Sequence, residues 1–179
     1  LTTDKENPIL YAIKSARTGG NYYFTLDGDK VKLVNNADIV GNDNAKWFFM
    51  LDGNKNVKIY PYAGEGKTMG YITVGNGAEK LTTDNNASGW VADTYSLYLN
   101  VDRAAEYNNK YFAFRPTEGT NFVSNYGGAN SAVGFYNEYN DNGTRLGFES
   151  INEVELANKI ATWEQYLAHE GDKVCQYVI

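Results

Sequence analysis

The sequence repeats one short pattern three times. Each copy is an extended run of apolar and aromatic residues, a turn that contains glycine, and a second extended run; the copies begin at Tyr11, Val57 and Tyr111. Divergent repeats roughly 50 residues apart indicate a unit that cannot bury its apolar face alone and must pack against its siblings. The repeat therefore predicts an all-β domain with pseudo-threefold symmetry, an architecture that more often displays binding loops than encloses an active-site cleft.

Short strand-forming runs continue through most of the chain, separated by clusters of Gly, Asn and Asp that favour tight turns. The run at 95–101 alternates strongly and can either complete the second repeat or begin the third. The predicted strands are 9–16, 22–26, 30–35, 47–51, 57–62, 69–74, 80–83, 90–92, 95–101, 111–115, 121–125, 133–137 and 145–151.

After residue 151 the periodicity changes from that of strands to that of a helix. Four apolar residues follow at spacings of four, three and four, as on one face of an amphipathic helix: Leu156, Ile160, Trp163 and Leu167. Asn152 and Glu155 have the spacing of a capping box, and Gly171 suits the end of the helix. A short strand at 174–179 can follow.

These patterns divide the chain into a polar lead-in at 1–8, a β domain at 9–151, and a helix with a short strand at 152–179. The length of 179 residues suits one domain with a sizeable core. The helix can pack against the open end of the β domain, which we favour, or begin a further domain.

Charge and composition exclude several classes of function. The net charge is −6, the pI is near 4.8, and the basic residues are scattered, so neither nucleic acid nor an anionic membrane surface is expected as a partner. No apolar run reaches the roughly 18 residues that a membrane-spanning helix needs, so we expect no membrane insertion. Cys175 is the only cysteine and there is no zinc signature, so we expect no disulfide, no metal and no cofactor.

The chain begins at Leu1 rather than at a methionine, and a polar segment follows. Trimming of a longer sequence accounts for this start, and so does removal of a signal peptide or a lipoprotein anchor segment. We favour removal, and therefore expect a secreted or cell-surface protein, periplasmic or extracellular.

Three units of four short strands resemble a β-trefoil, and the first unit is similar to the sugar-binding trefoils of the ricin B-chain type. In that class a first strand leads to a strand with a ligand-binding carboxylate, then to a strand that ends in an aromatic residue, then to a Gln-x-Trp signature. The matching segments here are Tyr11-Ala-Ile-Lys, Tyr23-Phe-Thr-Leu26, Val31-Lys-Leu-Val34 and Ala45-Lys-Trp47. The Tyr-rich strands and polar turns also resemble trefoil domains of secreted Bacteroidetes proteins. The resemblance implies a β-trefoil, followed by a C-terminal α-helix.

The resemblance is incomplete at the positions that bind sugar in that class. The signature glutamine is replaced by Ala45 and Ser88 in the first two units, and the third unit has Thr144-Arg-Leu146 there. The carboxylate position falls on residues that lack a carboxylate, namely Thr25, Ile72 and Ser124. Trp47 and Trp90 occur at corresponding places in two units, so we expect both to fill the core.

The third unit keeps most of the features of a sugar site. Tyr136 falls where the class places its stacking aromatic residue, and Asn142 lies close to the place of an amide. A flat aromatic face suits the C–H surface of a pyranose, and planar amides can bond to vicinal hydroxyls. An ordinary tyrosine-rich strand joined by a polar loop is the alternative interpretation. The predicted ligand-binding residues are Tyr136 as the platform, Asn125, Asn137 and Asn142 as polar partners, and Tyr126 beside them.

The sequence therefore predicts a non-catalytic, lectin-like module that binds a glycan or polysaccharide. His169, the sole histidine, is six residues from Cys175, and no orienting amide accompanies the pair, so we expect no nucleophilic catalysis. One alternative is a trefoil that binds a protein partner, as a protease inhibitor or adhesion module, through Gly75-Asn-Gly77 or Gly127-Gly128. Another is an accessory domain of a larger secreted enzyme.

Overall fold

Twelve strands, two short 3-10 turns and one helix make up the described part of the chain. The computed structural model describes residues 4–17, 21–35, 37–51, 57–64, 66–73, 79–84, 94–99, 111–116, 120–138 and 141–169. The strands are β1 (Tyr11–Ser15), β2 (Tyr22–Asp27), β3 (Lys30–Asn35), β4 (Trp47–Leu51), β5 (Val57–Pro61), β6 (Thr68–Thr73), β7 (Glu79–Asp84), β8 (Thr94–Leu99), β9 (Tyr111–Pro116), β10 (Phe122–Ser124), β11 (Gly134–Tyr136) and β12 (Leu146–Ser150). The 3-10 turns are η1 (Asp43–Ala45) and η4 (Asn142–Thr144), and the helix is α2 (Ile151–His169).

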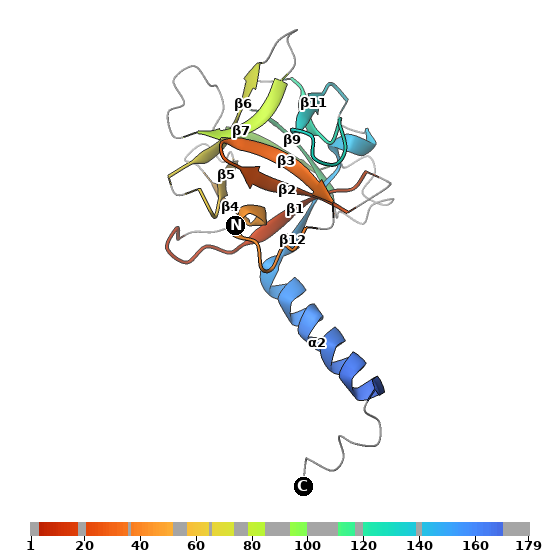
Figure 1. Cartoon of the computed structure of the whole chain (residues 1–179). Helices are drawn as coiled ribbons and strands as arrows, with labels where there is room; N and C mark the ends of the chain where they lie inside the picture. The colour runs from red at the N-terminus through yellow and green to blue at the C-terminus, as the bar shows by residue number, and fades with distance from the viewer. Residues whose placement is uncertain are drawn as a thin grey trace.

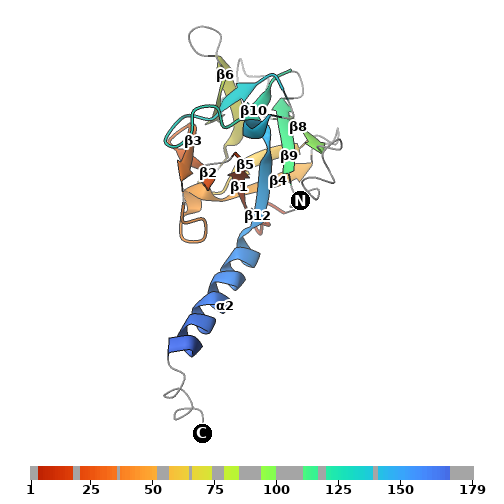
Figure 2. The ribbon, with the colours of Figure 1, turned by 90° about the vertical axis from the view of Figure 1, so that its right-hand side faces the viewer.

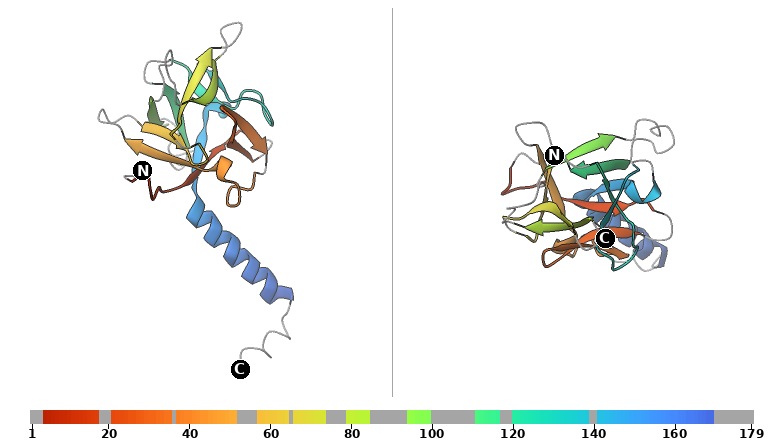
Figure 3. Two further views of the ribbon diagram at one scale, coloured as in Figure 1. Left: turned by 60° about the vertical axis from the view of Figure 1, so that its left-hand side comes forward. Right: turned by 90° about the horizontal axis from the view of Figure 1, so that it is seen from above.

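Six of the strands close into an antiparallel barrel. The pairing runs β1–β4–β5–β8–β9–β12 and returns to β1, so these six strands have no unpaired edge within the ring. The other six form the hairpins β2–β3, β6–β7 and β10–β11, one in each unit (Figure 1). Seen from above, the strands of the three units surround one centre (Figure 3). The predicted β-trefoil is confirmed.

All three units contribute to one buried core. Alternate residues of the barrel strands point inward, and they meet residues of the hairpins. Trp47 is fully buried at the centre, and its indole Nε1 donates to the backbone carbonyl of Phe24 over 3.0 Å. The predicted core position of Trp47 is confirmed. Its buried companions are Ile13, Phe24, Leu26, Val31, Leu33, Phe49, Ile59, Met69, Val123, Val133 and Leu146.

The strand register corrects the predicted equivalent of Trp47 in the second unit. Trp47 pairs with Pro61, and the corresponding pair in the next unit joins Tyr95 to Pro116. Tyr95, in β8, therefore occupies this position. β8 also completes the second unit, which settles the ambiguous run at 95–101. Trp90 and the predicted strand at 90–92 lie outside the described residues.

The helix follows β12 without a linker, and only its beginning packs on the β domain. Ile151 is buried and Val154 is half-buried in a small cluster with Leu10 and Ile39, and the Ile151 N–H donates to the Leu10 carbonyl over 3.0 Å. The rest of α2 points away from the strands, at the opposite end from the β6–β7 hairpin (Figures 1 and 2). No helix among the described residues is long and apolar enough to cross a membrane.

The structure changes two predictions about this helix. Packing against the β domain is wrong beyond the first turns, because the predicted apolar residues are largely exposed: Leu156, Ile160 and Trp163 are 59%, 50% and 64% exposed. The helix starts at Ile151, so Asn152 is not its cap, and Glu155 instead pairs with Lys159 at 2.8 Å. The predicted strand at 174–179 lies outside the described residues.

Three polar side chains link the closing strands on the outside of the barrel. Glu149 accepts from the Lys14 ammonium over 3.2 Å and from the Tyr23 hydroxyl over 3.0 Å. Burial lowers the pKa of Lys14, but the hydrogen bond and charge of Glu149 outweigh burial and raise it above its ordinary value. Burial, with the hydrogen bond to Glu149, also raises the pKa of Tyr23.

We expect the β domain to lose stability at alkaline pH through this cluster. The folded state binds both protons more tightly than the unfolded chain, so the stabilisation is complete below about pH 10 and is lost as the pH rises through the raised pKa values. At pH 7, Tyr23→Phe should lower the free energy of unfolding by about 1 kcal/mol. This deficit in the free energy of unfolding relative to wild type should shrink above about pH 10. Urea unfolding at several pH values measures both. A deficit that stays constant to pH 11, or an equal effect of the exposed control Tyr126→Phe, would contradict this assignment.

Trp47 and Trp163 offer the same substitution in two environments. Trp47→Phe removes the buried bond to Phe24 and leaves a cavity, so the free energy of unfolding should fall by about 1–3 kcal/mol. Trp163→Phe, on the exposed helix, should change it by less than about 0.5 kcal/mol. Equal effects of the two variants in chemical denaturation would be inconsistent with the core position of Trp47.

Candidate functional site

The structure brings the two predicted tyrosines of the third unit together. Tyr126 follows β10 and Tyr136 ends β11, and their ring centroids lie 6.3 Å apart with the planes tilted by 31°. The Tyr126 side chain is 65% exposed, whereas Tyr136 is half-buried. We call these two residues the tyrosine pair. It presents a mainly apolar face to solvent beside the β10–β11 hairpin.

Asn125 does not belong to the exposed surface, which corrects its predicted role as a ligand partner. It is fully buried, its amide Nδ2 donates to the Ser15 hydroxyl over 3.1 Å, and its Oδ1 accepts from the Gly128 N–H over 3.1 Å. Both ends of the amide are therefore occupied. Asn125 instead fixes the start of the loop at 125–131, because its side chain satisfies backbone and side-chain groups that this turn would otherwise leave unpaired.

Arg17 was not predicted, although it supports the same loop from another unit. This exposed residue follows β1, and its guanidinium donates to the backbone carbonyls of Asn125 and, over 3.4 Å, Tyr126. The third-unit loop is therefore held by two residues of the first unit, Arg17 and Ser15. Both residues are more than a hundred residues away from the loop in the sequence. A pattern within one repeat therefore could not predict this contact.

Backbone pairing with β3 holds the far end of the loop. Asn130 donates its N–H to the Leu33 carbonyl over 2.6 Å, and the Leu33 N–H donates to the Ser131 carbonyl over 3.0 Å. Gly128 (φ +74°) and Asn130 (φ +61°) adopt the left-handed conformation that turns the chain back. Anchored at both ends, the loop presents Tyr126 from a fixed backbone.

The two remaining predicted amides are exposed residues of the third unit. Asn137 is exposed and directly follows Tyr136, and Asn142 is exposed in η4. The Asn125 N–H donates to the Gly143 carbonyl over 2.9 Å, which seats η4 beside the loop. A Cβ on Gly143 would come within 2.6 Å of the Ser124 hydroxyl, so only glycine permits this approach. Asn137 and Asn142 keep the exposure that a ligand contact needs.

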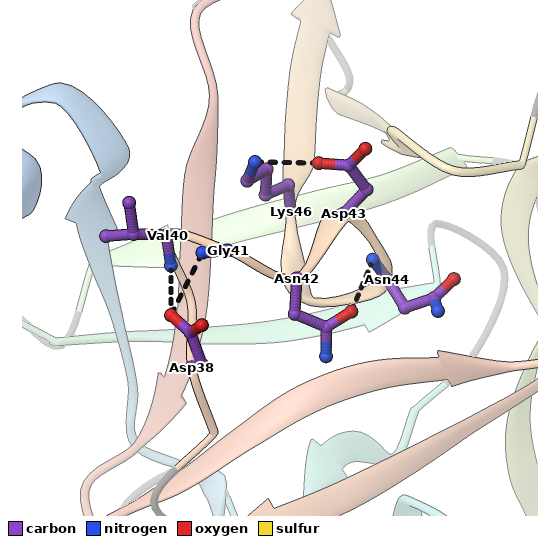
Figure 4. Close-up of polar contacts among 7 residues, drawn as sticks. All are labelled: Asp38, Val40, Gly41, Asn42, Asp43, Asn44 and Lys46. Atoms are coloured by element: carbon purple, nitrogen blue, oxygen red, sulfur yellow. Dashed lines mark hydrogen bonds and ion pairs between the residues drawn. The ribbon is translucent and has the colours of Figure 1, made fainter.

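The first unit repeats the scaffold of this site but not its aromatic face. Asn42 caps η1 by accepting from the Asn44 N–H (Figure 4). Asp141 caps η4 in the same way, by accepting from the Gly143 N–H. Asp38 accepts from the N–H groups of Val40 and Gly41. The polar atoms of this loop thus bind one another, and β3 ends in Asn35 where β11 ends in Tyr136. The first unit has the same turn without the platform.

A hollow lies between the lead-in and the turn after β5. It encloses about 500 Å³ and is lined in part by Lys5, Phe48, Tyr60 and Tyr62. Phe48 and Tyr60 stack at 5.0 Å, the Lys5 ammonium lies 4.4 Å from the Tyr60 centroid, and Tyr62 is 44% exposed. This hollow is a second aromatic surface, on the opposite side of β4 from the core.

Neither surface has the side chains of a metal site. Within the described ranges, no three His, Cys, Asp or Glu side chains are grouped so that they could hold a metal ion. The chemistry available at the tyrosine pair is therefore stacking, van der Waals contact and hydrogen bonding by exposed amides.

Comparison with known proteins identifies the fold. No protein-family model matches the sequence, and no curated protein matches it. Among solved structures, a mosquitocidal holotoxin matches with a TM-score of 0.64 and 20% identity over 80% of this chain, which spans only 17% of that toxin. The Macrolepiota procera ricin B-like lectin, solved in complex with lactose, matches with a TM-score of 0.61 and 12% identity over 83% of this chain and 99% of the lectin. The Rhizoctonia solani agglutinin matches with a TM-score of 0.60 and 14% identity over 80% of this chain and 96% of the agglutinin. The likeness lies in the fold, and this chain has a β-trefoil fold.

Proposed function

We propose that this β-trefoil binds carbohydrate without catalysis, as a module of a secreted or cell-surface protein. The proposed site is the tyrosine pair with its flanking amides, Asn137 and Asn142. The fold is consistent with this function, since one matching structure is a ricin B-like lectin in complex with lactose. At such low identity the fold alone does not carry a binding site, so the site must be argued from these side chains.

The observation that carries the proposal is an exposed aromatic ring on a fixed loop. Leaving 65% of a tyrosine in water beside a second ring provides apolar surface that a sugar ring can cover. The loop is bonded to Ser15, Arg17 and Leu33, so little conformational freedom is lost when a ligand binds. The flanking amides supply donors and acceptors in fixed directions for hydroxyl groups.

The shape of this surface sets the strength of binding. One or two rings and a few hydrogen bonds, without an enclosing pocket, suit a dissociation constant on the order of 0.1–1 mM. Specificity for one sugar would depend on which hydroxyls face Asn137 and Asn142.

A second function, binding of a protein partner, is favoured by the same fixed loop. Tyr126 and Gly127 are exposed at its tip, and a preorganised loop with an aromatic tip can enter a cleft in another protein. Tight binding to a protein, with no response to any glycan, would select this function. The other predicted loop, Gly75-Asn-Gly77, lies outside the described residues. The role of accessory domain in a larger enzyme remains a proposal for the full-length gene product.

We expect Tyr126→Ala and Tyr136→Ala each to weaken glycan binding by about tenfold, because each removes part of the stacking surface. A glycan array finds the ligand, and an NMR titration measures its affinity for each variant. Tyr62→Ala is the matched control, since Tyr62 is an exposed tyrosine of the second unit. If Tyr62→Ala lost binding and both other variants bound normally, the glycan site would lie in the hollow that Tyr62 lines, and the proposed site would be wrong.

Asn125 and Asn137 should respond differently to the same substitution. Asn125→Ala leaves buried partners unsatisfied, so it should lower the free energy of unfolding by about 1–3 kcal/mol and also weaken glycan binding. Asn137→Ala, at an exposed position, should weaken binding while changing stability by less than about 0.5 kcal/mol. Denaturation and titration of the same samples separate the effects. Full stability in Asn125→Ala would refute its positioning role.

A further inference from the structure

One face of α2 has a regular apolar surface that is largely exposed to solvent. Leu156, Ile160 and Trp163 are each at least half exposed. Their spacings of four and three place them on one side of the helix, and Leu167 continues the spacing along the sequence. We call these four positions the apolar stripe. Three large apolar side chains in a row on one helix face form the kind of exposed patch that marks an interaction surface.

The stripe faces away from the side of α2 that packs on the β domain. Successive residues are rotated by about 100° around a helix, so Ile151 and Val154 lie roughly opposite the stripe. These two residues pack in the cluster with Leu10 and Ile39. A second helix can therefore lie along the stripe while the β domain stays on the outer side.

Charged residues beside the stripe indicate which kind of partner fits it. The stripe has the spacing of a coiled-coil seam, with Leu156 and Trp163 at d positions and Ile160 at an a position. Lys159 then falls at a g position and Glu164 at the following e position. In a parallel pair, a g residue faces the e residue five positions later on the other helix. Lys159, which pairs with Glu155 at 2.8 Å within its own chain, would then also face Glu164 of the other copy. An antiparallel pair would instead bring g beside g and e beside e.

We propose that α2 pairs in parallel with α2 of a second copy of this chain, through the apolar stripe. Ile160 at a with Leu156 at d is the combination that favours two strands, and Trp163 occupies the other d position. The pairing needs little extra ordering, because α2 is already helical and its first turns are packed on the β domain. The proposal does not depend on the proposed function. If both hold, the dimer carries two glycan sites and gains avidity.

Sedimentation velocity of the whole chain over a range of concentrations tests the dimer. We expect a shift from 20.0 kDa to twice that mass as concentration rises. Leu156→Ser combined with Ile160→Ser should remain monomeric at every concentration. Ala161→Ser, which disturbs the helix away from the stripe, should dimerise like the wild type. A wild type that stays monomeric to about 1 mM, or association that survives the double substitution, would overturn the proposal.

Charge variants test the orientation and do not require an apolar residue to be lost. Lys159→Glu and Glu164→Lys each place like charges across a parallel seam, so each should weaken dimerisation by about five- to tenfold. Combining both substitutions in one chain, or mixing the two single variants, restores opposite charges and should restore association. Unchanged dimerisation in both single variants would overturn the parallel arrangement. Circular dichroism confirms that α2 stays helical in each variant.

Discussion

The pairing of β1 with β12 is the constraint on which the rest of the structure depends. It joins Tyr11–Ser15 to Leu146–Ser150 over five residue pairs and converts an open sheet into a closed ring. The same closure places the third unit beside the first, so that Ser15 and Arg17 reach the loop that carries Tyr126. It also fixes the point at which α2 leaves the barrel. The proposed site and the helix therefore both depend on a contact between the two ends of the β domain.

Much of the fold could be predicted because local patterns determine it. The strands at 22–26, 30–35 and 47–51 are bounded by turn residues that punctuate the chain clearly, and they were placed to within a residue. The direction in which α2 presents its apolar face could not be predicted. Periodicity shows that a helix has an apolar side but not what covers it. The equivalent of Trp47 was misplaced for a similar reason: strand register, and not residue type, identified Tyr95.

The candidate site was likewise predicted in part from the sequence. Tyr126 and Tyr136 could be predicted as a pair because both belong to the third unit and lie close together in the sequence, and the structure places their ring centroids 6.3 Å apart. The burial of Asn125 was not predictable, because an asparagine beside glycines has the composition of an exposed turn. Its partner Ser15 is 110 residues away, and only barrel closure brings the two side chains together. The sequence therefore did not predict how the loop is supported, whereas it did predict the residues on the loop's surface.

The direct passage from β12 into α2 also determines how the domain would respond to force. Ser150 ends the strand and Ile151 begins the helix, so tension on α2 is transmitted to β12 without slack. β12 is held by β1 on one side and by β9 on the other. A pull along a strand makes its ladder bonds slide together, and they must break nearly at once, whereas a pull across a strand opens them one by one. A trefoil tethered through α2 would therefore be loaded in shear along β12.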